Sequence, residues 1–210
     1  AGLLYFVATL AHPDAILWFG VAAAYAAIRT PRGAIAMAMP FAIPFAIYWG
    51  WRTAYFGDFL PNTAYAKDTA SPYQLLQGAI YIVGATGLAG LATAVIVLRA
   101  FAAGLWRRHE LSLMAAQIVV WAAYVIYVGG DALLMYRFWL PVLAPMSILL
   151  QESVAFHLES PMRARRRQLL LGATALIAAS TVIFAVVGPA ALRIQRKGEV
   201  DAGRIELGAW

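Results

Sequence analysis

The side chains that could do chemistry in this sequence concentrate in two short segments. Residues 51–68 read WRTAYFGDFLPNTAYAKD, and residues 127–141 read YVGGDALLMYRFWLP. Their carboxylates can accept a proton or a hydrogen bond, and their arginine and lysine side chains can bind an anion. With the acidic residue of an earlier His-Pro-Asp corner, the candidates are Asp14, Arg52, Asp58, Asn62, Lys67, Asp68, Asp131 and Arg137.

The first segment is too polar to cross a bilayer and unusually rich in aromatic residues. Such rings favour the boundary between lipid and water. Its Gly-Asp and Leu-Pro-Asn sequences are turn formers that would bend the chain back on itself. Non-helical backbone at this depth is tolerated where protein or a water-filled cavity covers it. We therefore expect a loop over residues 50–72 that lines a cavity, the alternative being an anchoring loop without chemistry.

The second segment combines a helix end with two opposite charges. The glycine pair before Asp131 predicts the end of one helix, and Arg137 follows within an otherwise apolar stretch. An unpaired charge at the centre of a membrane helix costs about 2.5–3.5 kcal/mol, and less near the interface. Ionisable groups in such places are functional candidates, but Asp131 and Arg137 could equally form a plain ion pair at a helix end.

The corner His12-Pro13-Asp14 gives a weaker signal. Histidine and aspartate there could share a proton or a hydrogen bond at the mouth of the cavity. Aspartate is also a strong N-cap residue, and we favour that capping role for Asp14. The other histidines, His109 and His157, adjoin arginine-rich sequence and are expected on the solvated surface.

The composition of the chain indicates which kind of secondary structure positions these residues. Of 210 residues, 63% are hydrophobic and 12% charged, with a mean hydropathy of +0.73. Soluble domains average about 25% charged residues, and disordered chains have low hydrophobicity, so both classes are excluded. The chain has no cysteine, which excludes disulfides, thiolate metal sites and cysteine nucleophiles. We expect an all-α, polytopic helical membrane protein.

Hydropathy gives a helix count of six or seven. A spanning helix needs about 20 mostly apolar residues. Pro13 either separates the opening apolar run, residues 1–10, from the next helix or kinks one long helix. The remaining apolar segments are residues 16–28, 34–50, 75–98, 111–128, 138–150 with an extension to 156, and 168–187.

The arginines of the loops predict the orientation. Basic residues collect on the cytoplasmic side of membrane proteins. Nine fall in alternate loops on one side: Arg29, Arg32, Arg99, Arg107, Arg108, Arg163, Arg165, Arg166 and Arg167. The other side has three, namely Arg52, Lys67 and Arg137. The formal charge of +6 thus reflects topology, no nucleic-acid partner is expected, and the candidate site faces outward.

Other familiar signatures are absent from the sequence. It contains no phosphate-binding Walker loop, dinucleotide fingerprint or HExxH motif. Neither an inverted repeat nor a pair of broken helices is evident, which disfavours a transporter. Gly84, Gly87 and Gly90 predict close helix packing.

The sequence lacks an initiator methionine and opens in an apolar run, so we expect a piece of a longer protein.

The two segments together resemble the flagellar motor control protein family, which is related to mycobacterial terminal β-(1→2)-arabinofuranosyltransferases. The pattern of that family is roughly WR..YYGD.LPNT.YAK followed later by GGD.M..RF..P. Matching residues in the first motif are Trp51, Arg52, Tyr55, Gly57, Asp58, Leu60, Pro61, Asn62, Thr63, Tyr65, Ala66 and Lys67; in the second they are Gly129, Gly130, Asp131, Met135, Arg137, Phe138 and Pro141.

The resemblance implies a GT-C type membrane glycosyltransferase. Such an enzyme moves a sugar, here with arabinofuranose as a candidate, from a polyprenyl-phosphate donor to a glycan or other acceptor on the outer face of a bacterial cytoplasmic membrane. It implies catalytic carboxylates at Asp131 and Asp58. Substrate-binding roles fall to Arg52, Asn62, Lys67, Arg137, Tyr55 and Tyr65.

The resemblance also implies a domain plan and a cofactor. Residues 1–188 would form the membrane domain, and residues 189–210 would begin an outward-facing C-terminal domain. Many such enzymes use a divalent metal, and two carboxylates with water molecules could hold Mg²⁺. Their usual base lies in a first outer loop, which would precede residue 1. The alternative functions are a non-enzymatic membrane assembly factor related to the flagellar motor and, after it, a transporter.

Overall fold

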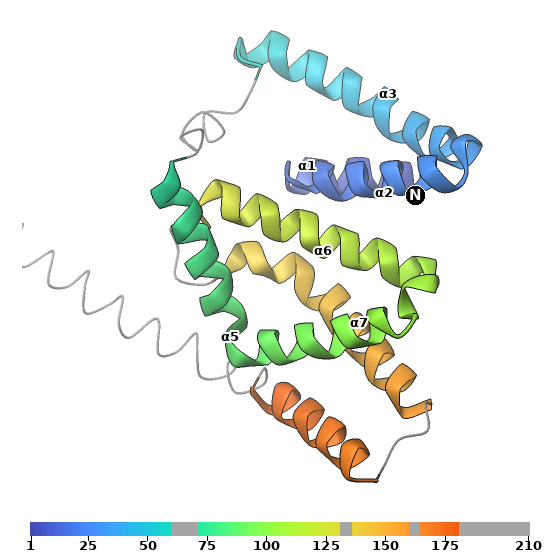
Figure 1. Ribbon diagram of the computed structural model, residues 1–210. Coiled ribbons are helices and arrows are strands. Elements are labelled where there is room, and N and C mark those ends of the chain that lie inside the picture. Colours follow the sequence, from blue (N-terminus) through green and yellow to red (C-terminus); the bar gives the residue numbers. More distant parts are fainter. Residues whose placement is uncertain (60–70, 131–135, 160–163, 181–210) are drawn as a thin grey trace, which may run out of the picture.

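The computed structural model describes residues 1–59, 71–130, 136–159 and 164–180, and within these ranges the chain is all-α. Seven α-helices are present there (Figure 1). The elements are α1 (Gly2–Ala11), α2 (Ala15–Arg29), α3 (Pro31–Phe56), α5 (Pro72–Ala102), the 3₁₀ turn η1 (Leu105–Arg107), α6 (His109–Val128), the 3₁₀ turn η2 (Arg137–Trp139), α7 (Leu140–Glu159) and a helix over 164–180.

A sharp corner separates the first two helices. His12 ends α1 in an extended conformation, with φ of −147° and ψ of 112°, and α2 begins after Pro13 and Asp14. Proline cannot donate the backbone hydrogen bond that a continuous helix would need here. Of the two alternatives left open by the sequence, Pro13 therefore separates two helices and does not kink one.

Helix α3 continues beyond the end that hydropathy predicts. The sequence suggested a loop from residue 50, whereas the helix runs to Phe56 and ends at Gly57, whose positive φ of 77° suits a glycine. Aromatic rings one turn apart stabilise this extension: Trp49 stacks on Phe45 at 5.2 Å and Tyr55 on Trp51 at 5.6 Å. The predicted loop is therefore helical over its first two turns.

Helix α5 is broken at Gly87, within the segment 75–98 that hydropathy predicts as one span. Gly87 has φ of 53° and ψ of −154°, a conformation open essentially to glycine alone. The two halves run in different directions on either side of it (Figure 1). Gly87 thus marks the kink of α5. Gly84 lies against the ring of Tyr136, which precedes η2, and not against a neighbouring helix as the sequence predicts.

Helix α6 lies centrally and packs against α2, α5 and α7. Its buried Trp121 and Val125 join Trp139 and Val142 in a hydrophobic cluster at one end of the bundle. Gly78 of α5 lies so close to α6 that an added Cβ would stand 2.5 Å from the backbone oxygen of Ile126. These contacts fix α5, α6 and η2 relative to one another.

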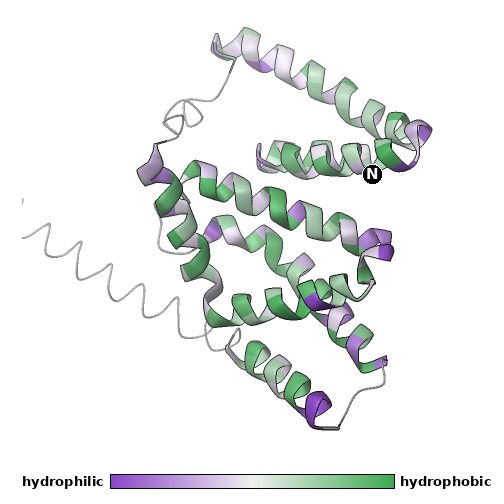
Figure 2. Cartoon of the chain, viewed as in Figure 1, coloured by the Kyte–Doolittle hydropathy of each residue, from purple (hydrophilic) through white to green (hydrophobic). Residues whose placement is uncertain are grey.

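By length and composition the chain is a candidate multi-pass membrane protein with four spans in its described part. These are α3, α5, α6 and residues Arg137–Glu159, whereas α1 and α2 are shorter apolar helices. Apolar residues cover much of the helix surfaces, and polar residues gather towards the helix ends (Figure 2). Exposed apolar side chains include Leu88 at 86% and Ile28 at 83%, which suits contact with lipid.

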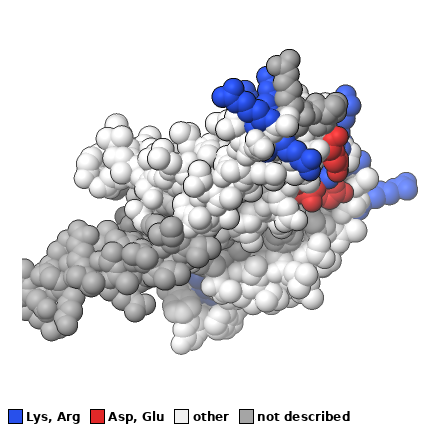
Figure 3. All heavy atoms as spheres, turned by 90° about the horizontal axis from the view of Figure 1, so that it is seen from below, with Lys and Arg blue, Asp and Glu red and all other residues white. Residues whose placement is uncertain are grey.

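Basic side chains gather at one end of the molecule (Figure 3). The end of α2, the start of α3, the end of α5 and the start of α6 lie together there (Figure 1). The Tyr25 hydroxyl donates a hydrogen bond to the His109 carbonyl across this end, and Arg108 pairs with Glu152 at 2.6 Å. We call it the arginine-rich end; its described arginines are Arg29, Arg32, Arg99, Arg107, Arg108, Arg165, Arg166 and Arg167.

Candidate functional site

Three of the predicted site residues lie at the C-terminal end of α3, opposite to the arginine-rich end (Figure 1): Arg52 and Tyr55 in the last turns of the helix and Asp58 just after its Gly57 cap. Arg52 donates hydrogen bonds to the backbone carbonyls of Asp58 and Phe59, at 3.4 and 3.1 Å. Its guanidinium also lies 5.2 Å from the Trp49 ring centroid. Arg52 thereby folds the chain back after Gly57, while Tyr55 and Asp58 remain exposed.

Arg137 opens η2, the short turn before α7, and its neighbour Phe138 is held at both backbone polar groups. The Trp121 Nε1–H donates to the Phe138 carbonyl at 2.5 Å, and the Phe138 N–H donates to the Tyr81 hydroxyl at 3.1 Å. Trp121 belongs to α6 and Tyr81 to α5, so two helices fix the backbone beside Arg137. Tyr136, in the left-handed conformation, places its ring against that of Tyr81.

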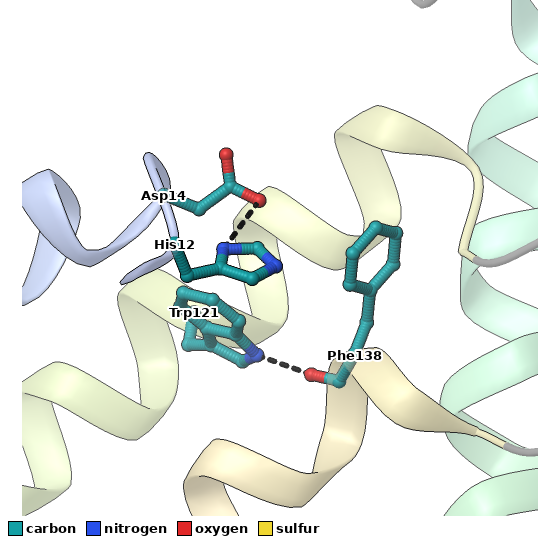
Figure 4. Close-up of polar contacts among 4 residues, drawn as sticks. All are labelled: His12, Asp14, Trp121 and Phe138. Atoms are coloured by element: carbon teal, nitrogen blue, oxygen red, sulfur yellow. Dashed lines mark hydrogen bonds and ion pairs between the residues drawn. The ribbon is translucent and has the colours of Figure 1, made fainter. Parts of the chain in front are cut away.

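The His12–Asp14 corner lies against the same turn. His12 Nδ1 is 3.5 Å from Asp14 Oδ2, and the His12 ring meets the Phe138 ring edge to face at 6.4 Å (Figure 4). The Asp14 carboxylate also interacts with the Tyr124 hydroxyl of α6. The corner therefore joins α1 and α2 to the α6–η2 region that carries Arg137.

The predicted capping role of Asp14 is wrong. Asp14 occupies the N-cap position of α2, but its side chain makes no capping hydrogen bond. Its backbone is itself helical, with φ of −67° and ψ of −11°, and the carboxylate points to His12 and Tyr124 instead. A favoured N-cap has an extended backbone, which directs its side chain to the first free N–H groups.

The predicted site residues are thus only partly placed. Arg52, Tyr55 and Asp58 share one end of α3, and Arg137 lies in η2, before α7. Both places lie towards the same end of the bundle (Figure 1). Asn62, Tyr65, Lys67 and Asp131 lie outside the described residues, as does Asp68. Convergence of Asp58, Asn62, Asp131 and Arg137 on one outward cavity stays a prediction.

Three aromatic residues of this region were not singled out from the sequence. Trp121 and Tyr81 make the hydrogen bonds that hold the Phe138 backbone, and Tyr124 interacts with the Asp14 carboxylate. The sequence indicates their role only weakly, because aromatic residues in apolar helices also serve as ordinary interface anchors. Their partners are far away in sequence, so only the packing of the helices identifies them.

The expected holding of Mg²⁺ by two carboxylates stays a prediction. No three His, Asp or Glu side chains of residues 1–59, 71–130, 136–159 and 164–180 lie close enough to hold a metal ion. Asp131, one of the two predicted carboxylates, lies outside them, and no step below depends on Mg²⁺.

A polar residue inside the bundle has a structural explanation. Gln117, on α6, is buried and donates hydrogen bonds to the Tyr5 hydroxyl and the Trp18 carbonyl, both at 3.4 Å. It therefore ties α6 to α1 and α2.

Comparison with protein-family models, curated proteins and solved structures found no match to this chain.

Proposed function

We propose that this protein is a GT-C type membrane glycosyltransferase that takes its sugar from a polyprenyl-phosphate donor. The observation that carries the proposal is the pair of motifs around Arg52–Lys67 and Gly129–Pro141, which resemble those of the arabinofuranosyltransferase-related family. The all-α fold with four candidate spans supports it. So does the location of Arg52, Asp58 and Arg137 away from the arginine-rich end.

In this proposal the arginines bind the phosphate of the donor and the polyprenyl chain stays in the bilayer. Arg137 is the first choice because the backbone beside it is held by Trp121 and Tyr81, so its planar guanidinium can be presented in a defined direction. Arg52, which already binds two backbone carbonyls, is the second, with Lys67 as a point charge. Asp58, Asn62 and Asp131 would bind sugar hydroxyls, and Tyr55 and Tyr65 would cover its apolar face.

The proposed reaction takes place on the outer side of a bacterial cytoplasmic membrane. The arginine-rich end would face the cytoplasm, following the preference of basic residues for that side. The opposite end, with His12, Arg52 and Arg137, would then meet donor and acceptor outside. Arabinofuranose is the sugar that the family resemblance favours, and a cell-wall glycan is the corresponding acceptor.

The test is sugar transfer by the protein in proteoliposomes supplied with polyprenyl-phosphate arabinofuranose and a glycan acceptor. We expect a labelled, chain-extended acceptor that empty vesicles do not produce. A protein that neither binds the donor nor extends any acceptor in a panel of arabinans and other cell-wall glycans would contradict the proposal and favour the assembly-factor alternative. The transporter alternative gains nothing from Gln117, because its amide is engaged within the bundle.

A further inference from the structure

The corner between α1 and α2 holds an imidazole and a carboxylate in an arrangement that suits proton transfer. His12 and Asp14 lie on either side of Pro13, with Nδ1 of His12 3.5 Å from Oδ2 of Asp14. The Asp14 side chain is largely covered, at 23% exposure, whereas that of His12 is 56% exposed. The carboxylate is thus held within the fold, and the imidazole reaches out from it.

A second contact fixes the carboxylate from the other side. The Tyr124 hydroxyl of α6 interacts with the Asp14 carboxylate, which therefore lies between α6 and the corner. A carboxylate so held favours the histidine tautomer that carries its proton on Nδ1, because that N–H can then donate to it. Nε2 is left as an acceptor, directed away from the carboxylate (Figure 4).

We propose that His12 is the general base that takes the proton of the acceptor hydroxyl, and that Asp14 is its positioning residue. This inference rests on the proposed glycosyltransferase function. It assigns to His12 the proton transfer for which the sequence suggested Asp58 or Asp131. Those two carboxylates are then left to bind hydroxyl groups of the substrates.

The step balances with the groups named. As the acceptor oxygen attacks the anomeric carbon of the donor, His12 Nε2 takes its proton and a new glycosidic bond forms. The bond between the anomeric carbon and the phosphate oxygen breaks, and its electron pair leaves with polyprenyl phosphate. The imidazolium then returns its proton to water, and Asp14 stabilises the positive charge while it lasts.

The position of His12 relative to Arg137 suits the two sides of this reaction. The His12 ring contacts the ring of Phe138, at 6.4 Å between centroids, and Phe138 directly follows Arg137 in the chain. Trp121 and Tyr81 hold the Phe138 backbone in place. The base and the proposed phosphate-binding cation are therefore supplied by neighbouring elements, as a transfer between acceptor and leaving phosphate requires.

The test compares His12→Gln with His109→Gln, a control at the arginine-rich end. Both variants are assayed in proteoliposomes for donor binding and for kcat of transfer. We expect His12→Gln to lower kcat by about 10²–10⁴-fold, the usual contribution of a general base, with donor affinity unchanged. His109→Gln should match the wild type. Retained donor binding shows that the His12 variant is folded.

Two further arms separate a base from a structural residue. Added imidazole should partly restore transfer by His12→Gly, because it can occupy the space left by the side chain. Asp14→Asn should lower kcat with little effect on KM, and Asp14→Glu should recover part of the loss. Transfer by His12→Gln at the wild-type rate, or no effect of imidazole on a donor-binding His12→Gly, would overturn this inference alone. A wild-type protein that neither binds nor transfers would overturn the proposed function with it.

Discussion

The indole N–H of Trp121 donates a 2.5 Å hydrogen bond to the backbone carbonyl of Phe138. This contact joins the C-terminal half of α6 to η2, and through Phe138 it reaches both Arg137 and the His12 ring. Trp121 is 3% exposed, so the bond lies in the hydrophobic cluster that it shares with Val125 and Trp139. The arrangement beside Arg137 thus depends on a buried side chain that touches no proposed substrate.

Trp121→Phe should therefore destabilise the fold. The change removes the donor and leaves the Phe138 carbonyl without this partner, which costs about 1–3 kcal/mol for a buried acceptor. Trp106→Phe is the matched control, since Trp106 is 56% exposed at the arginine-rich end. Unfolding by SDS in mixed micelles measures both. Equal stability of the two variants would show that the bond does not hold η2.

Gly78→Ala should also destabilise the protein, by about 1–3 kcal/mol, because the new methyl group would overlap the backbone of Ile126 and force α5 and α6 apart. The control is Gly20→Ala in α2, where an added Cβ meets nothing within 4 Å. Alanine has the higher helix propensity, so this change should be neutral or slightly stabilising. The same SDS titration distinguishes them, and an unaffected Gly78 variant would contradict the close approach of the two helices.

Hydropathy predicted the helices and missed the features that depend on contacts between them. The predicted segment 111–128 agrees closely with α6, because a long apolar run is a local signal. The extension of α3 past Arg52 escaped prediction since the polar residue lowers hydropathy while ring stacking and Gly57 continue the helix to its cap. In the sequence Gly87 looks like any other glycine in an apolar run, so the break of α5 could not be predicted from it.

The candidate site was predictable in its residue types and not in its contacts. Arg52, Asp58 and Arg137 stood out as charges in apolar surroundings. The role of Asp14 could not be read locally, because Tyr124, which holds its carboxylate, comes from a distant helix. An aspartate before a helix predicts a cap by default, and the tertiary contact redirected its side chain.

Cysteine labelling should reveal the proposed orientation, and the native sequence contains no cysteine to interfere. Arg32→Cys and Arg107→Cys should resist an impermeant maleimide added to intact cells, since basic loops stay in the cytoplasm. Lys67→Cys and Tyr73→Cys should react. Labelling of both pairs from outside would reject this topology, and reaction of the arginine positions only after membrane disruption would support it.

Gln117→Leu should leave sugar transfer unchanged. The amide joins α6 to Tyr5 and Trp18, and hydrogen bonds between helices in a membrane average about 0.6 kcal/mol, so the loss of stability should be small. Gln117→Glu provides a comparison that keeps a polar side chain. Loss of function by Gln117→Leu without loss of stability would point to a polar pathway through the bundle, as in a transporter.

The central claim, that the end opposite to the arginine-rich end binds a lipid-linked sugar phosphate, is tested most directly by donor binding to Arg137 variants. A lysine keeps the charge of Arg137 but cannot make the forked two-bond contact with phosphate. Losing one charge-assisted hydrogen bond costs about 1.5–3 kcal/mol, so Arg137→Lys should weaken binding of polyprenyl-phosphate arabinofuranose by about tenfold to a hundredfold. Arg137→Ala should weaken it further, and Arg107→Ala should bind like the wild type. Equal donor affinity of the wild type, Arg137→Lys and Arg137→Ala would contradict the claim.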